Sequence, residues 1–178
     1  MTECVTTSES SPWVARFAPL IPAESAVLDL ACGSGRHARL LAGLDHQVEA
    51  VDRDADALVA LAGVANVTTR CADLEGGPWP YYSRGFQGIV VSRYLWRPLM
   101  PLLFNCLDEG GVLIYETFMV GQEKFGKPSN PAFLLRPGEL LELVGKRFTV
   151  VAFEQGEGAD RQVIQRICVR RGLTTLLP

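Results

Sequence analysis

The chain has 178 residues, of which 48% are apolar, and it carries 17 basic against 20 acidic residues for a net charge of −3. A chain of this length builds one domain with a substantial core, because domains commonly have about 100–200 residues. The slight negative charge argues against nucleic acid or an anionic membrane as a partner.

The N-terminus and the cysteines predict a cytoplasmic protein. Residues 1–14 lack the basic start and apolar run of a signal peptide, and no segment approaches about 18 uninterrupted apolar residues. The five cysteines are scattered without a Cys-x-x-Cys pair, which is typical of reduced thiols. Two histidines and no carboxylate cluster of suitable spacing predict that the chain has no metal site.

The chain begins with a polar segment and then alternates strand and helix patterns. We expect a disordered tail over residues 1–11 and one domain over residues 12–178. Ser11 as N-cap, Pro12 at the first helical position and Pro22 as a stop predict a leading helix over residues 12–22. Apolar runs predict strands at 26–30, 47–51, 66–70, 88–92 and 112–117, and helical patterns lie at 35–44, 54–63, 98–107 and 137–144.

This alternation is typical of βαβ units, whereas the end of the chain differs. Two strand-like runs, 148–153 and 163–170, are joined by a connection too short for a crossover helix. The sequence therefore predicts an α/β single domain with a seven-stranded, mostly parallel sheet, an antiparallel last strand and helices on both faces.

The stretch VLDLACGSGRHARLLA, residues 27–42, ends an apolar run with two glycines and opens a helix. Gly33 and Gly35 lack a Cβ, so backbone amides there can approach a ligand closely. In a parallel sheet such a ligand binds at the carboxyl ends of the strands. His37 follows where a dinucleotide-binding turn needs further small residues, which disfavours a pyrophosphate, and Asp29 suits a ligand ammonium group instead.

Two more carboxylates follow the next two predicted strands. Asp52 ends the second strand, where it can accept both hydroxyls of a ribose. Asp73 ends the third strand, where it can accept the exocyclic amine of an adenine while Leu74 packs on the ring. Together with Asp29, these residues describe a ligand with an amino acid, a ribose and an adenine but no phosphate, as in S-adenosylmethionine.

The segments DLACGSG, VEAVD and CADL resemble the motifs of class I S-adenosylmethionine-dependent methyltransferases. The family pattern is D-x-G-x-G-x-G, an acidic residue ending the second strand, and an aspartate after the third; Ala31 replaces the first glycine with another small residue. The resemblance implies a Rossmann-like fold and S-adenosyl-L-methionine as cofactor. The implied cofactor-binding residues are Asp29, Ala31, Gly33, Gly35, Asp52, Arg53, Asp73, Leu74 and Ser92.

The segments SRYLWRPL and YETFMVGQEKFGKPSNPAFLLRPGELLEL are similar to small bacterial methyltransferases of the tellurite-resistance-like group. This likeness implies a small-molecule acceptor, namely a thiol, a chalcogen oxyanion or a small acid. The expected reaction is in-line transfer of the methyl group to an acceptor that approaches past three catalytic residues, Tyr94, Arg97 and Glu116. The segment 119–134 contains glycines and prolines close together and predicts a mobile lid.

Smaller expectations complete the interpretation. His37 lies on a first helical turn, where it lines the cofactor rim or stabilises the turn, and His46 lies on the surface. The basic segment QRICVRRG marks the solvated side of an edge strand. The leading helix, with Trp13 and Phe17, closes over the cofactor.

Three alternative functions remain open from the sequence. The first is a non-catalytic S-adenosylmethionine-binding module, and the second is a nucleic-acid or protein methyltransferase. The third is a nicotinamide-dependent oxidoreductase, which Asp29 and the missing third glycine oppose. The sequence leaves the oligomeric state undetermined.

Overall fold

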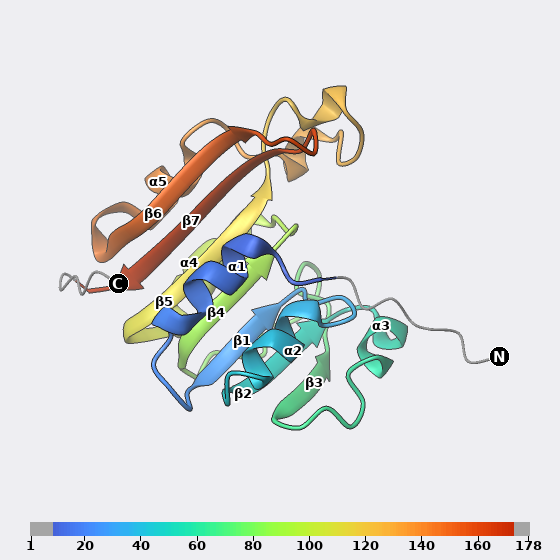
Figure 1. Ribbon diagram of the computed structural model, residues 1–178, viewed down its shortest axis with the longest axis vertical. Coiled ribbons are helices and arrows are strands. Elements are labelled where there is room, and N and C mark those ends of the chain that lie inside the picture. The colour runs from blue at the N-terminus through green and yellow to red at the C-terminus, as the bar shows by residue number, and fades with distance from the viewer. Residues whose placement is uncertain (1–8, 173–178) are drawn as a thin grey trace.

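The computed structural model describes residues 9–172, which form one seven-stranded sheet with helices on both faces (Figure 1). The strand order is β3-β2-β1-β4-β5-β7-β6. The strands are β1 (Ala26–Leu30), β2 (Gln47–Asp52), β3 (Val67–Cys71), β4 (Phe86–Ser92), β5 (Leu107–Phe118), β6 (Phe148–Glu157) and β7 (Val163–Arg171). The first five strands are paired in parallel, and β7 is antiparallel to both β5 and β6. The predicted fold class is confirmed.

The helices are short and divide between the two faces of the sheet. One face carries α1 (Pro12–Phe17), α2 (Arg36–Ala42) and α3 (Ala55–Val59), and the other carries α4 (Met100–Cys106) and α5 (Glu139–Val144) (Figure 1). Asp54 caps α3, because its Oδ1 accepts hydrogen bonds from the backbone of Asp56 and Ala57 at 3.1 Å each. The four helices expected after the leading one are all present.

Both faces of the central strands are buried, which explains their continuous apolar runs. Val27 and Ala50 pack with α1 and α2 in one apolar cluster, whereas Leu28 and Leu30 pack with α4 and α5 in the other. Because side chains alternate across a strand, each of β1, β2, β4, β5 and β7 contributes to both clusters. The two layers of helices therefore hold the strand ends in a fixed arrangement.

The leading helix packs on the sheet and not over a ligand. Ser11 caps it, since its Oγ accepts a hydrogen bond from the Trp13 backbone at 3.1 Å, and α1 gives way to a short 3₁₀ helix at Ala18–Leu20. Trp13 and Phe17 are 2% and 4% exposed and belong to the cluster between α1, α2 and the sheet. The expected closure over the cofactor is wrong, because these rings cover apolar strand residues. Residues 1–8 of the expected tail lie outside the described residues.

Two further expectations are corrected. The segment QRICVRRG lies in β7, which is an inner strand because the final hairpin places β6 outside it. Arg170 accordingly donates a hydrogen bond to the Leu20 carbonyl at 3.2 Å, and Arg171 donates to the carbonyl of Leu107. His46 is 2% exposed and not on the surface, because the turn after α2 folds back and its backbone donates to the Leu41 carbonyl.

Over residues 9–172, no helix is long and apolar enough to cross a bilayer.

Candidate cofactor and acceptor site

The turn between β1 and α2 is built on residues with positive φ. Gly33 and Gly35 have φ values of +55° and +78°, which glycine adopts without strain. A Cβ on Gly35 would also lie 2.4 Å from the Leu61 side chain. The Gly33 backbone donates a hydrogen bond to Asp52 Oδ2 at 2.7 Å, which fixes the turn against the end of β2.

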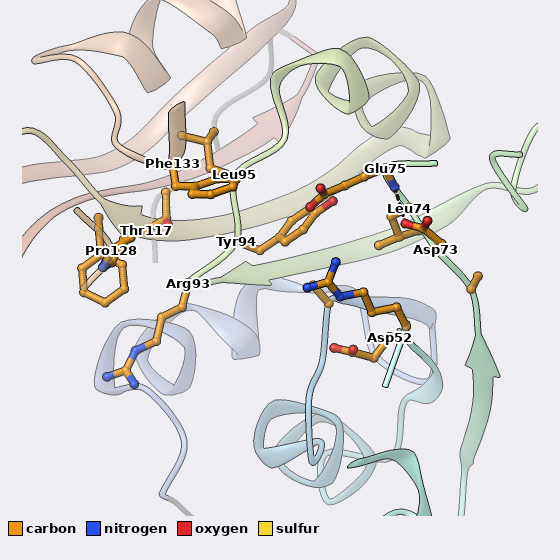
Figure 2. A pocket seen from close by; sticks show the side chains of 14 residues that line it. Asp52, Asp73, Leu74, Glu75, Arg93, Tyr94, Leu95, Thr117, Pro128 and Phe133 are labelled. Carbon is orange, nitrogen blue, oxygen red and sulfur yellow. Dashed lines mark hydrogen bonds between the residues drawn. The ribbon is translucent and has the colours of Figure 1, made fainter. Parts of the chain in front are cut away.

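A cavity of about 390 Å³ opens beside this turn, at the carboxyl ends of the strands (Figure 2). Its volume is within the usual range for a small-molecule site. The lining residues are Ala31, Asp52, Arg53, Ala72, Asp73, Leu74, Glu75, Arg93, Tyr94, Leu95, Thr117, Phe118, Pro128 and Phe133. We call it the first cavity. Six of the predicted site residues line it, namely Ala31, Asp52, Arg53, Asp73, Leu74 and Tyr94.

The carboxylates of Asp52, at the end of β2, and of Asp73, shortly after β3, are held by backbone amides. Asp52 Oδ1 accepts a hydrogen bond from the Asp54 backbone at 3.0 Å, in addition to the bond from Gly33. Asp73 Oδ1 accepts one from the Glu75 backbone at 3.0 Å, and such backbone contacts lower the pKa of Asp73. Because each carboxylate oxygen has two lone pairs, both side chains can still accept hydrogen bonds from ligand groups in the first cavity.

Asp29 lies near the turn but does not line the first cavity. It is 1% exposed, and its Oδ2 has no hydrogen-bond partner among the described residues. Burial raises the pKa of Asp29 to about 7. A buried carboxylate with an orphaned oxygen fits the ammonium group that the sequence predicts beside it, since a cation would stabilise its charged form.

Ser92 connects the ends of β4 and β5. Its Oγ donates a hydrogen bond to Glu116 Oε1 at 2.9 Å and accepts one from Arg36 Nη2 at 3.2 Å. Glu116 is 8% exposed and lines a different cavity from Asp52. The predicted base and the predicted cofactor carboxylates therefore lie in two neighbouring cavities.

This second cavity has a volume of about 270 Å³. It is lined by Glu9, Ser10, Ser11, Pro12, Arg36, Arg93, Glu116, Thr117, Phe118, Asp160, Gln162, Ile164 and Arg166. Arg93, Thr117 and Phe118 line both cavities, so the ends of β4 and β5 form the wall between them. Arg93 has a φ of +56°, and in Figure 2 its side chain points away from Tyr94.

The three predicted catalytic residues do not come together. Tyr94 lines the first cavity and points toward Glu75 and Leu74, on the side of the predicted adenine site (Figure 2). Its hydroxyl has no partner among the described residues, and burial raises the pKa of Tyr94, so the phenol stays protonated. Glu116 lines the second cavity, and Arg97 lines neither.

Arg97 is held by an ion pair and two backbone carbonyls outside both cavities. Its Nε donates to Glu139 Oε1 at 2.6 Å, and its terminal nitrogens donate to the carbonyls of Ala132 and Leu134 at 2.8 Å each. These bonds fasten the end of the segment 119–134 to α5. Pro128 and Phe133 of that segment line the first cavity, whereas its predicted mobility stays a prediction.

His37 stabilises the start of the leading helix. Its Nε2 accepts a hydrogen bond from the Ser11 backbone at 3.2 Å, and the ring is 3% exposed. Burial, together with the charges of Arg36 and Arg93, lowers the pKa of His37 to about 4. The neutral ring is therefore an acceptor that joins residue 11 to α2, which differs from the expected roles of lining the cofactor rim or stabilising the glycine turn.

Several cavity residues were not predicted. Arg36, Thr117 and the segment 9–12 carry no motif, although Thr117 lies at the end of β5. Position at the ends of neighbouring parallel strands is the one sequence signal that indicates Thr117. The hairpin residues Asp160 and Gln162 have no such signal, because their place depends on how β6 and β7 pair.

Comparison with known proteins finds one family model that is similar to part of the chain. A family model described as a methyltransferase domain matches residues 27–111, from β1 into β5. No curated protein matches the chain.

Solved structures share the fold. TehB from Haemophilus influenzae is 17% identical with a TM-score of 0.75, and the match covers 94% of this chain and 64% of that one. The N-methyltransferase NodS from Bradyrhizobium japonicum WM9 is 17% identical, with coverages of 92% and 99% and a TM-score of 0.66. A 1,6-didemethyltoxoflavin-N1-methyltransferase from Burkholderia thailandensis, solved with S-adenosylhomocysteine, is 18% identical, with coverages of 90% and 76% and a TM-score of 0.67. This chain thus spans about 64% of the length of the TehB chain.

Proposed function

We propose, from the premise that this chain carries a class I S-adenosylmethionine-dependent methyltransferase domain, that it transfers a methyl group to a small-molecule acceptor. The observation that carries the proposal is the composition of the first cavity. One side has the carboxylates of Asp52 and Asp73, and the other side is an apolar wall that includes Phe118 and Phe133. A polar adenosyl site next to an apolar wall in a cavity of this size favours a small acceptor.

The residues of β1, β2 and β3 are proposed to hold the cofactor. Asp52 accepts hydrogen bonds from the ribose hydroxyls, and Asp73 accepts one from the adenine amine. Leu74 and the Tyr94 ring pack against the adenine, and Arg53 lies at the cavity edge. The turn contributes backbone groups at Ala31, Gly33 and Gly35, while Asp29 and Ser92 face the ammonium end.

When bound, S-adenosylmethionine supplies a methyl carbon that its sulfonium already activates, so alignment is the main task of the protein. Thr117 is 2% exposed, and with Phe118 it forms a wall that positions the acceptor and limits water. Glu116, held by Ser92, is placed to take a proton from an acceptor that must lose one. Tyr94 and Arg97 are not assigned to proton transfer, because they contact the adenine side and the 131–134 segment.

The first test is calorimetric titration with S-adenosylmethionine, S-adenosylhomocysteine and NADH. We expect the two adenosyl ligands to bind and NADH not to bind. Asp52→Asn removes a charged acceptor, and we expect it to weaken binding by about tenfold or more. Asp56→Asn is the matched control, because Asp56 is exposed on α3 and lines neither cavity. Binding of NADH alone would refute the proposal.

The second test concerns the acceptor. Thiols, chalcogen oxyanions and small carboxylic acids are screened for the formation of S-adenosylhomocysteine, with transfer RNA and a protein mixture as further acceptors. Turnover with a small molecule supports the proposal. Turnover with RNA or protein alone would contradict it, and cofactor binding without any turnover would favour a regulatory module.

A further inference from the structure

The second cavity contains two arginines that the proposed cofactor site does not use. Arg36 begins α2 and Arg93 follows β4, and both line this cavity. Its other walls come from residues 9–12, the end of β5 and the connection between β6 and β7. The cavity therefore joins three parts of the chain around two guanidinium groups.

Neither arginine has a carboxylate oxygen within 4.0 Å among residues 9–172. Arg36 donates to neutral acceptors, the Glu9 carbonyl and Ser92 Oγ, at 3.2 Å each. Arg93 donates to Gln162 Oε1 at 3.4 Å, which is a long hydrogen bond. Both groups thus keep donors for a further partner.

A third arginine in the same cavity, Arg166, differs from these two because it is paired with a carboxylate. Arg166 donates to Glu154 Oε2 from Nε at 2.9 Å and from Nη2 at 2.5 Å, so its charge is already paired. The carboxylates that face the cavity are Glu9, Glu116 and Asp160. Glu116 accepts a hydrogen bond from Ser92, while Glu9 and Asp160 are exposed. Arg36 and Arg93 are therefore the pair left to bind an anion.

The two guanidinium groups also repel each other. Burial and the charge of Arg93 lower the pKa of Arg36, although the charges of Glu116 and Asp29 oppose this effect. A ligand carboxylate between the two groups would relieve the repulsion and form charge-assisted hydrogen bonds. An anionic ligand group is the chemistry that this arrangement favours.

We propose that Arg36 and Arg93 bind the carboxylate of a small methyl acceptor whose apolar body lies along Phe118 toward the first cavity. The proposal rests on the proposed function and names the substrate class for it. Because Arg93, Thr117 and Phe118 line both cavities, one molecule can place its charged end in the second cavity and its body beside the cofactor site.

The test uses acids and their neutral amides as paired probes. Phenylacetate and phenylacetamide, and butyrate and butyramide, are titrated into the full chain saturated with S-adenosylhomocysteine, with ligand-observed NMR as readout. We expect at least one acid to bind about tenfold or more tightly than its amide, because only the acid forms charge-assisted bonds. Equal binding of acid and amide in every pair, or binding of neither, would overturn the proposal.

Variants of the two arginines test whether these side chains bind the acid. We expect Arg36→Gln and Arg93→Gln each to weaken acid binding by about tenfold, and Arg93→Gln to leave S-adenosylhomocysteine affinity within about twofold. Arg16→Gln, on the outer face of α1, removes the same charge away from both cavities and should change neither affinity. If Arg93→Gln weakens S-adenosylhomocysteine binding instead, Arg93 binds the carboxylate of the cofactor and the proposal is wrong. If the wild-type chain binds no S-adenosylhomocysteine, the proposed function itself fails.

Discussion

The carboxyl-terminal edge of the sheet has two halves that are assembled differently. The half that we propose to bind the cofactor consists of the ends of β1, β2 and β3, and each of its main residues lies within or shortly after its strand in the sequence. The half that we propose to bind the acceptor combines the ends of β4 and β5 with residues 9–12, 128–133 and 160–166. The proposed cofactor site is therefore built from local motifs, whereas the proposed acceptor site depends on long-range packing.

The largest expected effect tests whether α1 belongs to the acceptor half alone. Trp13→Ala removes a buried ring that also donates to the Ile167 carbonyl at 3.4 Å, and we expect about 3–5 kcal/mol loss in the free energy of unfolding. Urea unfolding measures the loss. S-adenosylhomocysteine affinity of the folded variant should stay within about twofold, since Trp13 lines neither cavity. A large loss of that affinity would mean that α1 does cover the cofactor.

The next effect concerns pH and the cofactor half. A ligand ammonium requires ionised Asp29, whose pKa in the free protein is raised by burial to about 7. Protons therefore compete with the ligand, and affinity for S-adenosylhomocysteine falls as the pH falls. From pH 8 to pH 5 we expect a loss of up to about 100-fold, equivalent to about 2.7 kcal/mol. Calorimetry across this range measures it.

Asp29→Asn provides the control for this pH dependence. The amide does not titrate, so its affinity should be weaker at pH 8 and nearly constant down to pH 5. A wild-type affinity that does not change with pH would show that Asp29 has no contact with the ligand ammonium.

A smaller effect is expected at the ion pair that fastens the segment 131–134. Arg97→Ala leaves the buried Glu139 without its closest cation, at 2.6 Å. Because Arg97 is itself 37% exposed, we expect about 2 kcal/mol loss in unfolding free energy, less than for a fully buried pair. Arg136→Ala, whose side chain is 67% exposed, is the control and should cost about 0.5 kcal/mol or less.

The Arg97→Ala variant also separates cofactor binding from acceptor binding. Cofactor affinity should be unchanged, because Arg97 lines neither cavity. Acceptor turnover should fall through a raised KM as the Phe133 wall loosens. A fall in kcat alone, with an unchanged free energy of unfolding, would indicate that Arg97 has a catalytic role.

Much of the fold was predictable because its signals are local. Each of the seven strands and the five α-helices lies within about five residues of its expected range. Apolar periodicity and helix caps such as Ser11 and Asp54 depend only on residues that are close in the sequence, which is why they could be recognised. The turn at Gly33 and the carboxylates Asp52 and Asp73 were found for the same reason. His46 and the arginines of β7 were misplaced because their burial depends on packing against distant segments.

The sequence by itself determined the alternation of strands and helices, the glycine turn and the carboxylates at the ends of consecutive strands, because each is a short-range pattern with one favourable geometry. The tertiary structure alone decided which side chains share a cavity. It separated Tyr94, Arg97 and Glu116, which are close in the sequence or in expected role, and it joined Arg36 to Arg93 across the sheet edge. The physical reason is that contacts among side chains follow from the packing of α1, the final hairpin and the segment 119–134, and no local pattern encodes those contacts.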